Sequence, residues 1–245
     1  ITVVDIDDTV TVHLKNLTIS GTGQYAITAG RGATLYAESL IVENAGNGIT
    51  VHDGGIAYLS DITVSATSNA VLVTRNGTAK IYNNSLLQNS PGGLTVYYGS
   101  HAQVDNSTIK GNQLGVYMKQ ASLDVYGSTI SNNTEDGFLL HHNSSAEINN
   151  SNILSNTRDG LTLRNGSQAF VVNSVIDGSQ SNGVYINANS VMQTDNLTVK
   201  NSTNIKCKIF FSMRLCKAKK CIFENRTTSN STSRHAFYVL RQINS

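Results

Sequence analysis

The chain has 245 residues, of which 14% are charged, and it contains 20 glycines, one proline and no tryptophan. Residues that line the solvent faces of long helices are scarce, and Ser, Thr, Asn and Gly, which suit turns and exposed strands, fill the polar positions. The net charge of +2 predicts no nucleic-acid or anionic-membrane partner, and no apolar run is long enough for a helix that crosses a bilayer.

A repeat of 22 or 23 residues runs through most of the chain. Its marker is a small residue followed by an apolar, a variable and a second apolar residue, as in Gly48-Ile49-Thr50-Val51. The small residues of the eight markers are Ala26, Gly48, Ala70, Gly93, Gly115, Gly137, Gly160 and Gly183. Such constant spacing predicts a repeat architecture in which each unit packs only on its neighbours.

Each repeat contains two further short strand patterns. The first pattern alternates between outward and inward positions, as in residues 102–105, 146–149 and 169–172. The second begins with a polar corner, as in residues 106–109 and 173–176. Corners rich in Asn, Gly, Ser and Asp tolerate left-handed backbone, and we expect their Asn side chains to stack in hydrogen-bonded ladders. The Leu/Asn consensus of leucine-rich repeats is absent, and a propeller blade needs about 40 residues. The sequence therefore predicts an all-β, right-handed parallel β-helix of about nine coils.

The pattern and the charge both change near residue 203. Residues 1–203 hold nine Lys and Arg against fifteen Asp and Glu, whereas residues 204–245 hold nine against one. We predict a solenoid over 1–203 and an atypical basic tail over 204–245, which either caps the solenoid or is foreign to the fold, as after a shifted reading frame. The tail holds Cys207, Cys216 and Cys221, without the close pair of a zinc site. The chain begins without Met or a secretion signal, so we expect a truncated fragment.

The strand after each small residue should point its second and fourth residues outward. Equivalent outward residues then form two columns, Thr95, Tyr117, Leu139, Thr162 and Tyr185 in one and Tyr97, Lys119, His141, Arg164 and Asn187 in the other. Aromatic side chains stack on sugar rings, and cationic donors bind sugar carboxylates. We therefore predict a glycan-binding face of Tyr97, Tyr117, Lys119, His141, Arg164 and Tyr185. The alternative is that strand propensity alone places Tyr and Thr there.

A second candidate site precedes two of the marker glycines. Asp136 and Asp159 are 23 residues apart, so they should lie about 5 Å apart on adjacent coils, with Glu135 over Arg158. Two close carboxylates invite a cation such as Ca²⁺, and with Arg164 they are candidate catalytic residues. The alternative is ordinary Asp-Gly turn chemistry beside a surface ion pair of small value.

Other reactive groups are sparse. The remaining Asp and Glu residues occur about once per coil without a convergent cluster, and no nucleophile elbow, phosphate-binding loop or zinc motif is present. The adjacent His141 and His142 should point to opposite sides of a strand, so they cannot chelate one metal. We therefore predict no metal site and no cofactor, with Ca²⁺ as the one alternative.

Residues 11–200 resemble the passenger regions of bacterial autotransporter adhesins, the pertactin-like β-helices. The phrases that carry the resemblance are Asn47–Gly55, Arg75–Ile81, Asn106–Ile109 and Arg164–Ala169, in which a polar corner precedes an alternating strand. The resemblance implies an exported virulence factor, secreted or displayed at the outer membrane. Its partner would be a carbohydrate or receptor of a host cell or a neighbouring bacterium. The signal peptide and the C-terminal membrane barrel of that family have no counterpart in the sequence.

Three functions compete. We expect an adhesin-like surface rod, because the repeats are clean and no reactive cluster interrupts them. The alternative is a polysaccharide lyase or another carbohydrate-processing enzyme acting on acidic polysaccharide, since such enzymes share the fold. Pectate-lyase-like enzymes use aspartates for Ca²⁺ and a basic residue as proton abstractor, roles that Asp136, Asp159 and Arg164 would take. The third interpretation is a non-functional remnant of a larger gene.

Overall fold

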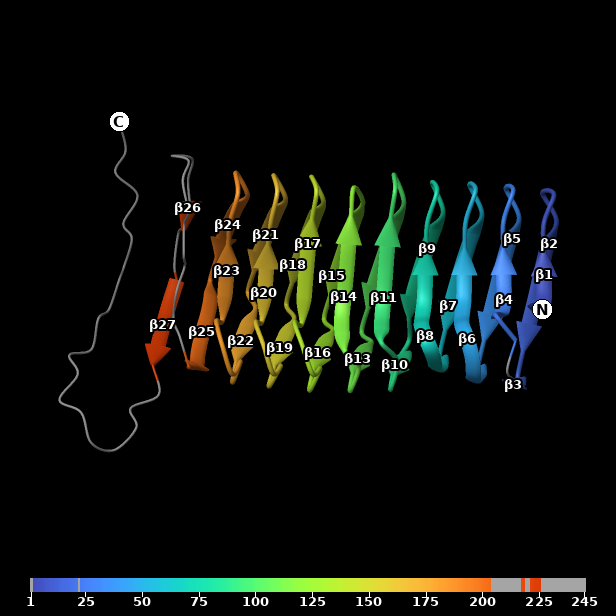
Figure 1. Cartoon of the computed structure of the whole chain (residues 1–245), viewed down its shortest axis with the longest axis horizontal. Helices are drawn as coiled ribbons and strands as arrows, with labels where there is room; N and C mark the ends of the chain where they lie inside the picture. Colours follow the sequence, from blue (N-terminus) through green and yellow to red (C-terminus); the bar gives the residue numbers. More distant parts are fainter. Residues whose placement is uncertain (1, 22, 204–216, 219–220, 226–245) are drawn as a thin grey trace.

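The computed structural model describes residues 2–21, 23–203, 217–218 and 221–225. Over these residues the backbone winds into a right-handed parallel β-helix of about nine coils, which confirms the predicted fold. Figure 1 shows the coils side by side along the long axis, with the N-terminal coil at one end. The described residues form strands, turns and bends, and none of them lies in a helix that could span a membrane.

Each coil contributes to three stacks of parallel strands, named here in the order in which a coil meets them. The first stack contains β1 (Thr2–Ile6), β4 (Tyr25–Ala29), the ends of β6 (Ile41–Val51) and β8 (Thr63–Val73), β11 (Gly92–Tyr97), β14 (Leu114–Lys119), β17 (Phe138–His141), β20 (Leu161–Leu163) and β23 (Val184–Ile186). The second stack contains β2 (Thr11–Lys15), β5 (Thr34–Glu38), β7 (Ile56–Ser60), β9 (Thr78–Tyr82), β12 (His101–Asp105), β15 (Ser122–Tyr126), β18 (Ser145–Asn149), β21 (Gln168–Val172), β24 (Val191–Asp195) and β26 (Lys217–Ala218). The third stack contains β3 (Thr18–Ser20), the beginnings of β6 and β8, β10 (Leu86–Gln88), β13 (Thr108–Lys110), β16 (Thr129–Ser131), β19 (Asn152–Leu154), β22 (Val175–Asp177), β25 (Leu197–Ser202) and β27 (Cys221–Asn225).

The marker positions require small residues because adjacent coils approach each other closely there. A Cβ atom on Gly137 would lie 2.7 Å from the carbonyl oxygen of Gly160 and 2.8 Å from the Asn156 amide nitrogen. A Cβ atom on Gly115 would likewise lie 2.5 Å from the carbonyl oxygen of Gly137. The regular spacing of small residues in the sequence therefore marks the positions where one coil packs closely against the next.

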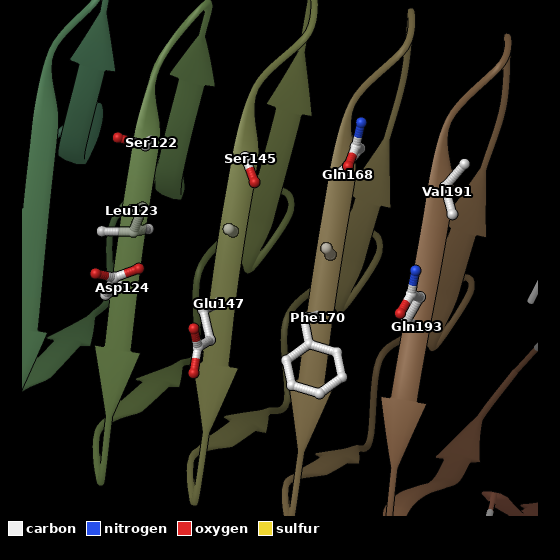
Figure 2. Close-up of a pocket in the computed structure, with 11 residues that line it drawn as sticks. Ser122, Leu123, Asp124, Ser145, Glu147, Gln168, Phe170, Val191 and Gln193 are labelled. Atoms are coloured by element: carbon white, nitrogen blue, oxygen red, sulfur yellow. The ribbon is translucent and has the colours of Figure 1, made fainter. Parts of the chain in front are cut away.

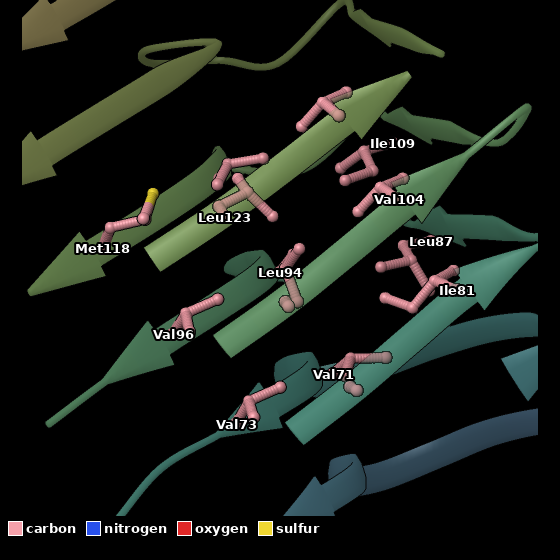
Figure 3. Packing of buried hydrophobic residues seen from close by; sticks show 14 of the residues in the cluster. Val71, Val73, Ile81, Leu87, Leu94, Val96, Val104, Ile109, Met118 and Leu123 are labelled. Atoms are coloured by element: carbon pink, nitrogen blue, oxygen red, sulfur yellow. The ribbon is translucent and has the colours of Figure 1, made fainter. Parts of the chain in front are cut away.

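The core is a set of apolar columns inside the three stacks. Val116 and Met118 are fully buried, while Tyr117 and Lys119 between and after them are partly exposed, as the alternation predicts. Phe138 is 0% exposed and pairs in register with Val116 of the preceding coil and Leu161 of the following coil. Figure 3 shows how such side chains from successive coils fill the interior. Each coil therefore completes the core of its neighbours.

Buried polar ladders close the corners between the stacks. The backbone nitrogen of Asn112 donates to Oδ1 of Asn133 at 3.0 Å, and that of Asn133 donates to Oδ1 of Asn156 at 3.1 Å. A serine ladder does the same at another corner, where the Ser128 nitrogen donates to Ser151 Oγ at 3.2 Å. These bonds confirm the predicted Asn ladders and satisfy backbone groups that would otherwise be buried without partners.

The corner after the first stack requires left-handed backbone on successive coils. Its first residue has a φ of 49° at Arg75, 51° at Tyr98, 52° at Gln120, 50° at His142 and 53° at Asn165. Asn tolerates this conformation, but Arg, Tyr and Gln adopt it at a cost of about 1 kcal/mol or more. Bulky side chains are therefore held at this edge of the first stack by the fold around them.

The boundary at residue 203 and the origin of the tail stay predictions. Residues 204–216, 219–220 and 226–245, which include Cys207 and Cys216, lie outside the described residues. Within the predicted tail, β26 pairs in parallel with β24, and β27 pairs in parallel with β25 from Leu197–Cys221 onward. The backbone of these two strands thus extends the second and third stacks.

Candidate functional site

The predicted outward columns lie in register on the first stack. Tyr97 pairs with Lys119 and Lys119 with His141, and Leu140 pairs with Leu163, which places Arg164 next to His141. In the other column Tyr117 pairs with Leu139, and Thr162 pairs with Tyr185. The structure thus brings the six predicted glycan-binding residues onto one face.

Two threonines of the columns are buried, and their hydroxyl groups form local hydrogen bonds. Thr95 is 2% exposed and donates to Asn69 Oδ1 at 2.6 Å, and Thr162 is fully buried and donates to Asp159 Oδ2 at 3.3 Å. Neither hydroxyl is offered to a ligand. The accessible part of the face is therefore formed by tyrosines and cationic side chains.

Three tyrosines form an open cluster at one end of this face. The Tyr97 and Tyr117 rings are perpendicular with centroids 5.4 Å apart, and the Tyr97 and Tyr98 centroids are 5.5 Å apart at 43°. Tyr98 is 48% exposed, and the sequence analysis missed it because it lies at the corner, beyond the strand pattern. Burial, reinforced by Tyr117 and Tyr98, raises the pKa of Tyr97 to about 12, so its hydroxyl remains a donor at neutral pH.

A second aromatic column, on the outer face of the second stack, has different geometry. His13, Tyr36 and Tyr58 stack with centroids 4.6 and 4.8 Å apart and interplanar angles of 6° and 9°. Both faces of Tyr36 are covered by its neighbours, so only ring edges reach solvent. In the perpendicular packing of Tyr97 and Tyr117 the edge of one ring meets the face of the other, so the two ring faces do not cover each other.

The cations of the first stack rest on aromatic rings and not on carboxylates. Lys119 Nζ lies 5.5 Å from the centroid of Tyr98, and Arg164 Cζ lies 5.4 Å from that of Tyr185. Neither cation forms an ion pair with a carboxylate in the described part of the chain, and Arg164 Nε is buried without a hydrogen-bond partner. The other described arginines each pair with at least one carboxylate, as in Arg31–Asp7, Arg75–Asp53 and Arg158–Asp136.

The predicted geometry of the adjacent histidines was wrong. The His141 and His142 rings lie on the same side with centroids 4.1 Å apart, and their Nδ1 atoms are in contact. The strand β17 ends at His141, and the left-handed φ of 50° at His142 turns its side chain back over the preceding one. Burial, then His142, Arg164 and Lys119, lowers the pKa of His141 below its usual range.

Asp136 and Asp159 lie on adjacent coils as predicted, but their oxygens are already engaged. Arg158 donates to both oxygens of the fully buried Asp136, at 2.7 and 2.8 Å, and the backbone nitrogen of Asp159 donates to Asp136 Oδ1 at 3.1 Å. Asp159 Oδ1 accepts two bonds of 2.8 Å from the backbone and side-chain nitrogens of Asn182. The two aspartates therefore continue the corner ladder, with carboxylates in place of amides.

Arg158 forms the expected ion pair at this corner and a second, shorter one. Arg158 Nη1 lies 3.4 Å from Glu135 Oε2, as predicted, but the shorter bonds go to Asp136. The hydrogen bonds and charge of Asp136, followed by Glu135 and Asp159, raise the pKa of Arg158. The Arg158–Glu135 pair lies at the surface as expected, with 42% and 33% of the side chains exposed, whereas the bond of Arg158 to the buried Asp136 was not predicted.

The donor set at Asp136 and Asp159 does not fit a divalent cation. The Asp136 carboxylate is neutralised by Arg158, and one oxygen of Asp159 is saturated by Asn182. Among the described residues no three His, Cys, Asp or Glu side chains gather in an arrangement that could hold a metal ion. The catalytic roles suggested for Asp136, Asp159 and Arg164 stay predictions.

Three carboxylates lie near one tyrosine of the second stack without forming a metal site in the described part of the chain. Asp105, Asp124 and Glu147 surround Tyr126 on the outer face of the second stack, where burial first and then these charges raise its pKa. They come from three successive coils: Asp124 and Glu147 occupy equivalent positions, and Asp105 lies two residues further along its strand. The 23-residue spacing of Asp124 and Glu147 predicts their pairing, whereas Asp105 lies outside that column.

Comparison with known proteins bears on the fold. The pectate lyase Pel9A is similar in structure, with a TM-score of 0.64 over 91% of this chain and 70% of that chain at 16% identity. The A-module of the mannuronan C-5 epimerase AlgE4 from Azotobacter vinelandii has a TM-score of 0.60 over 89% of this chain and 73% of that chain, at 14% identity. No curated protein sequence matches the chain. The family described as the right-handed β-helix region matches residues 2–145 and 69–237, so the chain belongs to this family.

Proposed function

We propose that the protein is an adhesin-like β-helix that binds acidic glycans. The binding surface is the basic aromatic face of the first stack, formed by Tyr97, Tyr98, Tyr117, Lys119, His141, Arg164 and Tyr185. Its ligand is a polysaccharide of a host or bacterial surface. An extracellular position, secreted or at the cell surface, and an origin as an autotransporter passenger belong to the same proposal.

The observation that carries this proposal is the unpaired charge of Lys119 and Arg164. Each cation is held over a tyrosine ring and lacks a described carboxylate partner. A guanidinium offers paired donors that match a carboxylate, and no described carboxylate is paired with Arg164. A uronic-acid ligand supplies that carboxylate.

The spacing of the cations favours a linear ligand. Lys119, His141 and Arg164 come from three successive coils, and parallel strands lie about 4.8 Å apart. A polymer with one carboxylate on each sugar repeats its charge along its length. Such a chain, laid along the rod axis, meets successive cations and the tyrosines beside them.

A polysaccharide-processing enzyme is the second candidate. Pel9A is named for pectate and AlgE4 for mannuronan, and both are uronic-acid polymers. The lowered pKa of His141 keeps its imidazole neutral at pH 7, between two cations that would stabilise a developing negative charge. A lyase product absorbs ultraviolet light through its new double bond. Release of that product from polygalacturonate or alginate, with and without Ca²⁺, would favour the enzyme, and its absence would favour binding alone.

Replacing Arg164 by alanine is expected to weaken binding of a polygalacturonate oligosaccharide by about 10- to 100-fold. A hydrogen bond to a charged group contributes about 1.5–3 kcal/mol, which corresponds to this range. Isothermal titration calorimetry measures the change. Arg75→Ala is the matched control, because Arg75 lies at the same edge but is bound to Asp53 at 2.6 Å. Equal affinities of the Arg164→Ala and Arg75→Ala variants would refute the proposed face.

Affinity for the same oligosaccharide is expected to rise as the pH falls from 7.5 to 5. His141 gains its charge below its ordinary pKa of about 6.5, whereas uronic acids stay ionised over this range. The increase should be about three- to tenfold, typical of one added charge near the surface. His141→Gln removes this titration, so its affinity should change less with pH. An unchanged pH profile in His141→Gln would contradict the role of His141.

A further inference from the structure

A groove of about 260 Å³ crosses the outer face of the second stack. It spans four successive strands, β15, β18, β21 and β24, and Figure 2 shows its lining side chains projecting from them. The lining residues are Ser122, Leu123, Asp124, Ser145, Ala146, Glu147, Gln168, Ala169, Phe170, Val191 and Gln193. It lies on a different stack from the basic aromatic face.

Two axial rows of side chains form this groove. Asp124 pairs with Glu147, Glu147 with Phe170 and Phe170 with Gln193, so carboxylates, a phenyl ring and an amide follow one another along the rod. The row beside them runs from Ser122 through Ser145 and Gln168 to Val191. Over four coils the rows extend about 14 Å. The groove therefore suits an elongated ligand lying along the axis.

The carboxylates of the groove lack a permanent cation. The described ion partner of Asp124 is His101 Nε2 at 3.8 Å, which is charged only when protonated. Glu147 forms no ion pair with any residue that the structure describes, and its hydrogen bond comes from the Tyr126 hydroxyl. The nearby Lys80 is directed to Asp105, at 3.5 Å. A cationic ligand would balance the charge of Asp124 and Glu147.

Phe170 adds an apolar plate directly beside these carboxylates. Its side chain is 43% exposed on an outward strand position, where the protein leaves its ring uncovered. Ligand sites commonly combine an aromatic surface with a few polar groups that fix orientation. A ring with an apolar face fits over Phe170 while its substituents reach Glu147 and Gln168.

We propose that this groove is a second carbohydrate site, selective for oligosaccharides of cationic amino sugars. The ammonium groups of glucosamine units pair with Asp124 and Glu147, and the apolar face of a pyranose ring stacks on Phe170. Hydroxyl groups bond to Ser122, Ser145, Gln168 and Gln193, whose side chains both donate and accept. The rod thus carries two faces of opposite charge preference on the same coils.

The test uses the full chain and a β-1,4-linked glucosamine tetramer, titrated by calorimetry at pH 6. Binding is expected, and Glu147→Gln should weaken it about tenfold or more, as expected for a lost bond between charged groups. The control is Glu38→Gln, because Glu38 lies on the same stack and is paired with Lys15 at 2.8 Å. The N-acetylated tetramer, which has the same rings without charge, should bind at least about tenfold more weakly.

Several results would overturn the assignment. No binding of the glucosamine tetramer, or equal affinities of Glu147→Gln and Glu38→Gln, would exclude an amino-sugar site. Tighter binding of a tetralysine peptide than of the tetramer would identify a surface for basic peptides instead. Circular dichroism verifies that each variant is folded, and the conservative Glu147→Gln exchange keeps the size of the side chain. Arg164→Ala should leave tetramer affinity unchanged, which separates this site from the basic aromatic face.

Discussion

Replacing Phe138 by alanine is expected to lower the free energy of unfolding by about 3–5 kcal/mol. Among the residues that the structure describes, Phe138 is the largest fully buried side chain, and it pairs in register with Val116 and Leu161 of the adjacent coils. Parallel pairing on both sides fixes the backbone, so the coils cannot close the cavity left by the missing ring. Chemical denaturation followed by circular dichroism at 218 nm, in the β-sheet band, measures the loss.

Phe170→Ala is the matched control for this substitution. The same ring is removed from a strand that faces outward, where 43% of the side chain is already exposed. Its removal leaves no internal cavity, so the loss should stay within about 1 kcal/mol. Similar losses for the two variants would contradict the assignment of Phe138 to the interior and of Phe170 to the surface.

Arg158→Ala is expected to destabilise the protein by about 2–3 kcal/mol. It removes the cation that binds both oxygens of Asp136, which is 0% exposed, and it leaves a buried carboxylate without its charge partner. Loss of one member of a fully buried pair costs about 3–5 kcal/mol, and the 42% exposure of the Arg158 side chain reduces the expected figure. Urea denaturation of the variant and the parent chain gives the difference.

A second substitution tests the cause. Asp136→Asn removes the charge but keeps an oxygen that accepts the Asp159 backbone bond, as Asn47 Oδ1 accepts from the Asn69 nitrogen at 3.3 Å. In an Asp136→Asn background, Arg158→Ala should therefore cost less than about 1 kcal/mol. An undiminished cost in that background would show that Arg158 acts through packing and not through the charge of Asp136.

The architecture could be predicted from the sequence because its causes are local and repeated. Steric contact between coils requires a small residue at Gly115, Gly137 and Gly160, and alternation decides which neighbours of these residues face the core. The two outward columns follow from the same register, so the predicted face from Tyr97 to Arg164 is assembled as expected.

The remaining features depend on backbone conformation that the pattern does not encode. His142 lies in a left-handed corner, which reverses the side predicted for its ring, and Tyr98 joins the tyrosine cluster for the same reason. The partner of Arg158 depends on the exact reach of a long side chain toward Asp136. The groove on the second stack is formed by ordinary strand residues such as Ser145 and Gln168, so no sequence motif predicts it.

The stacking of equivalent strands has a consequence for how such a protein can change in length. An insertion of one residue within a strand would exchange its inner and outer side chains, whereas a duplicated segment of one whole coil, such as residues 137–159, would keep every column aligned. The rod can therefore grow or shrink only in whole layers, and each added layer contributes one more outward residue to every column. A gene of this kind can therefore lengthen its outward columns while the packing of its interior stays the same.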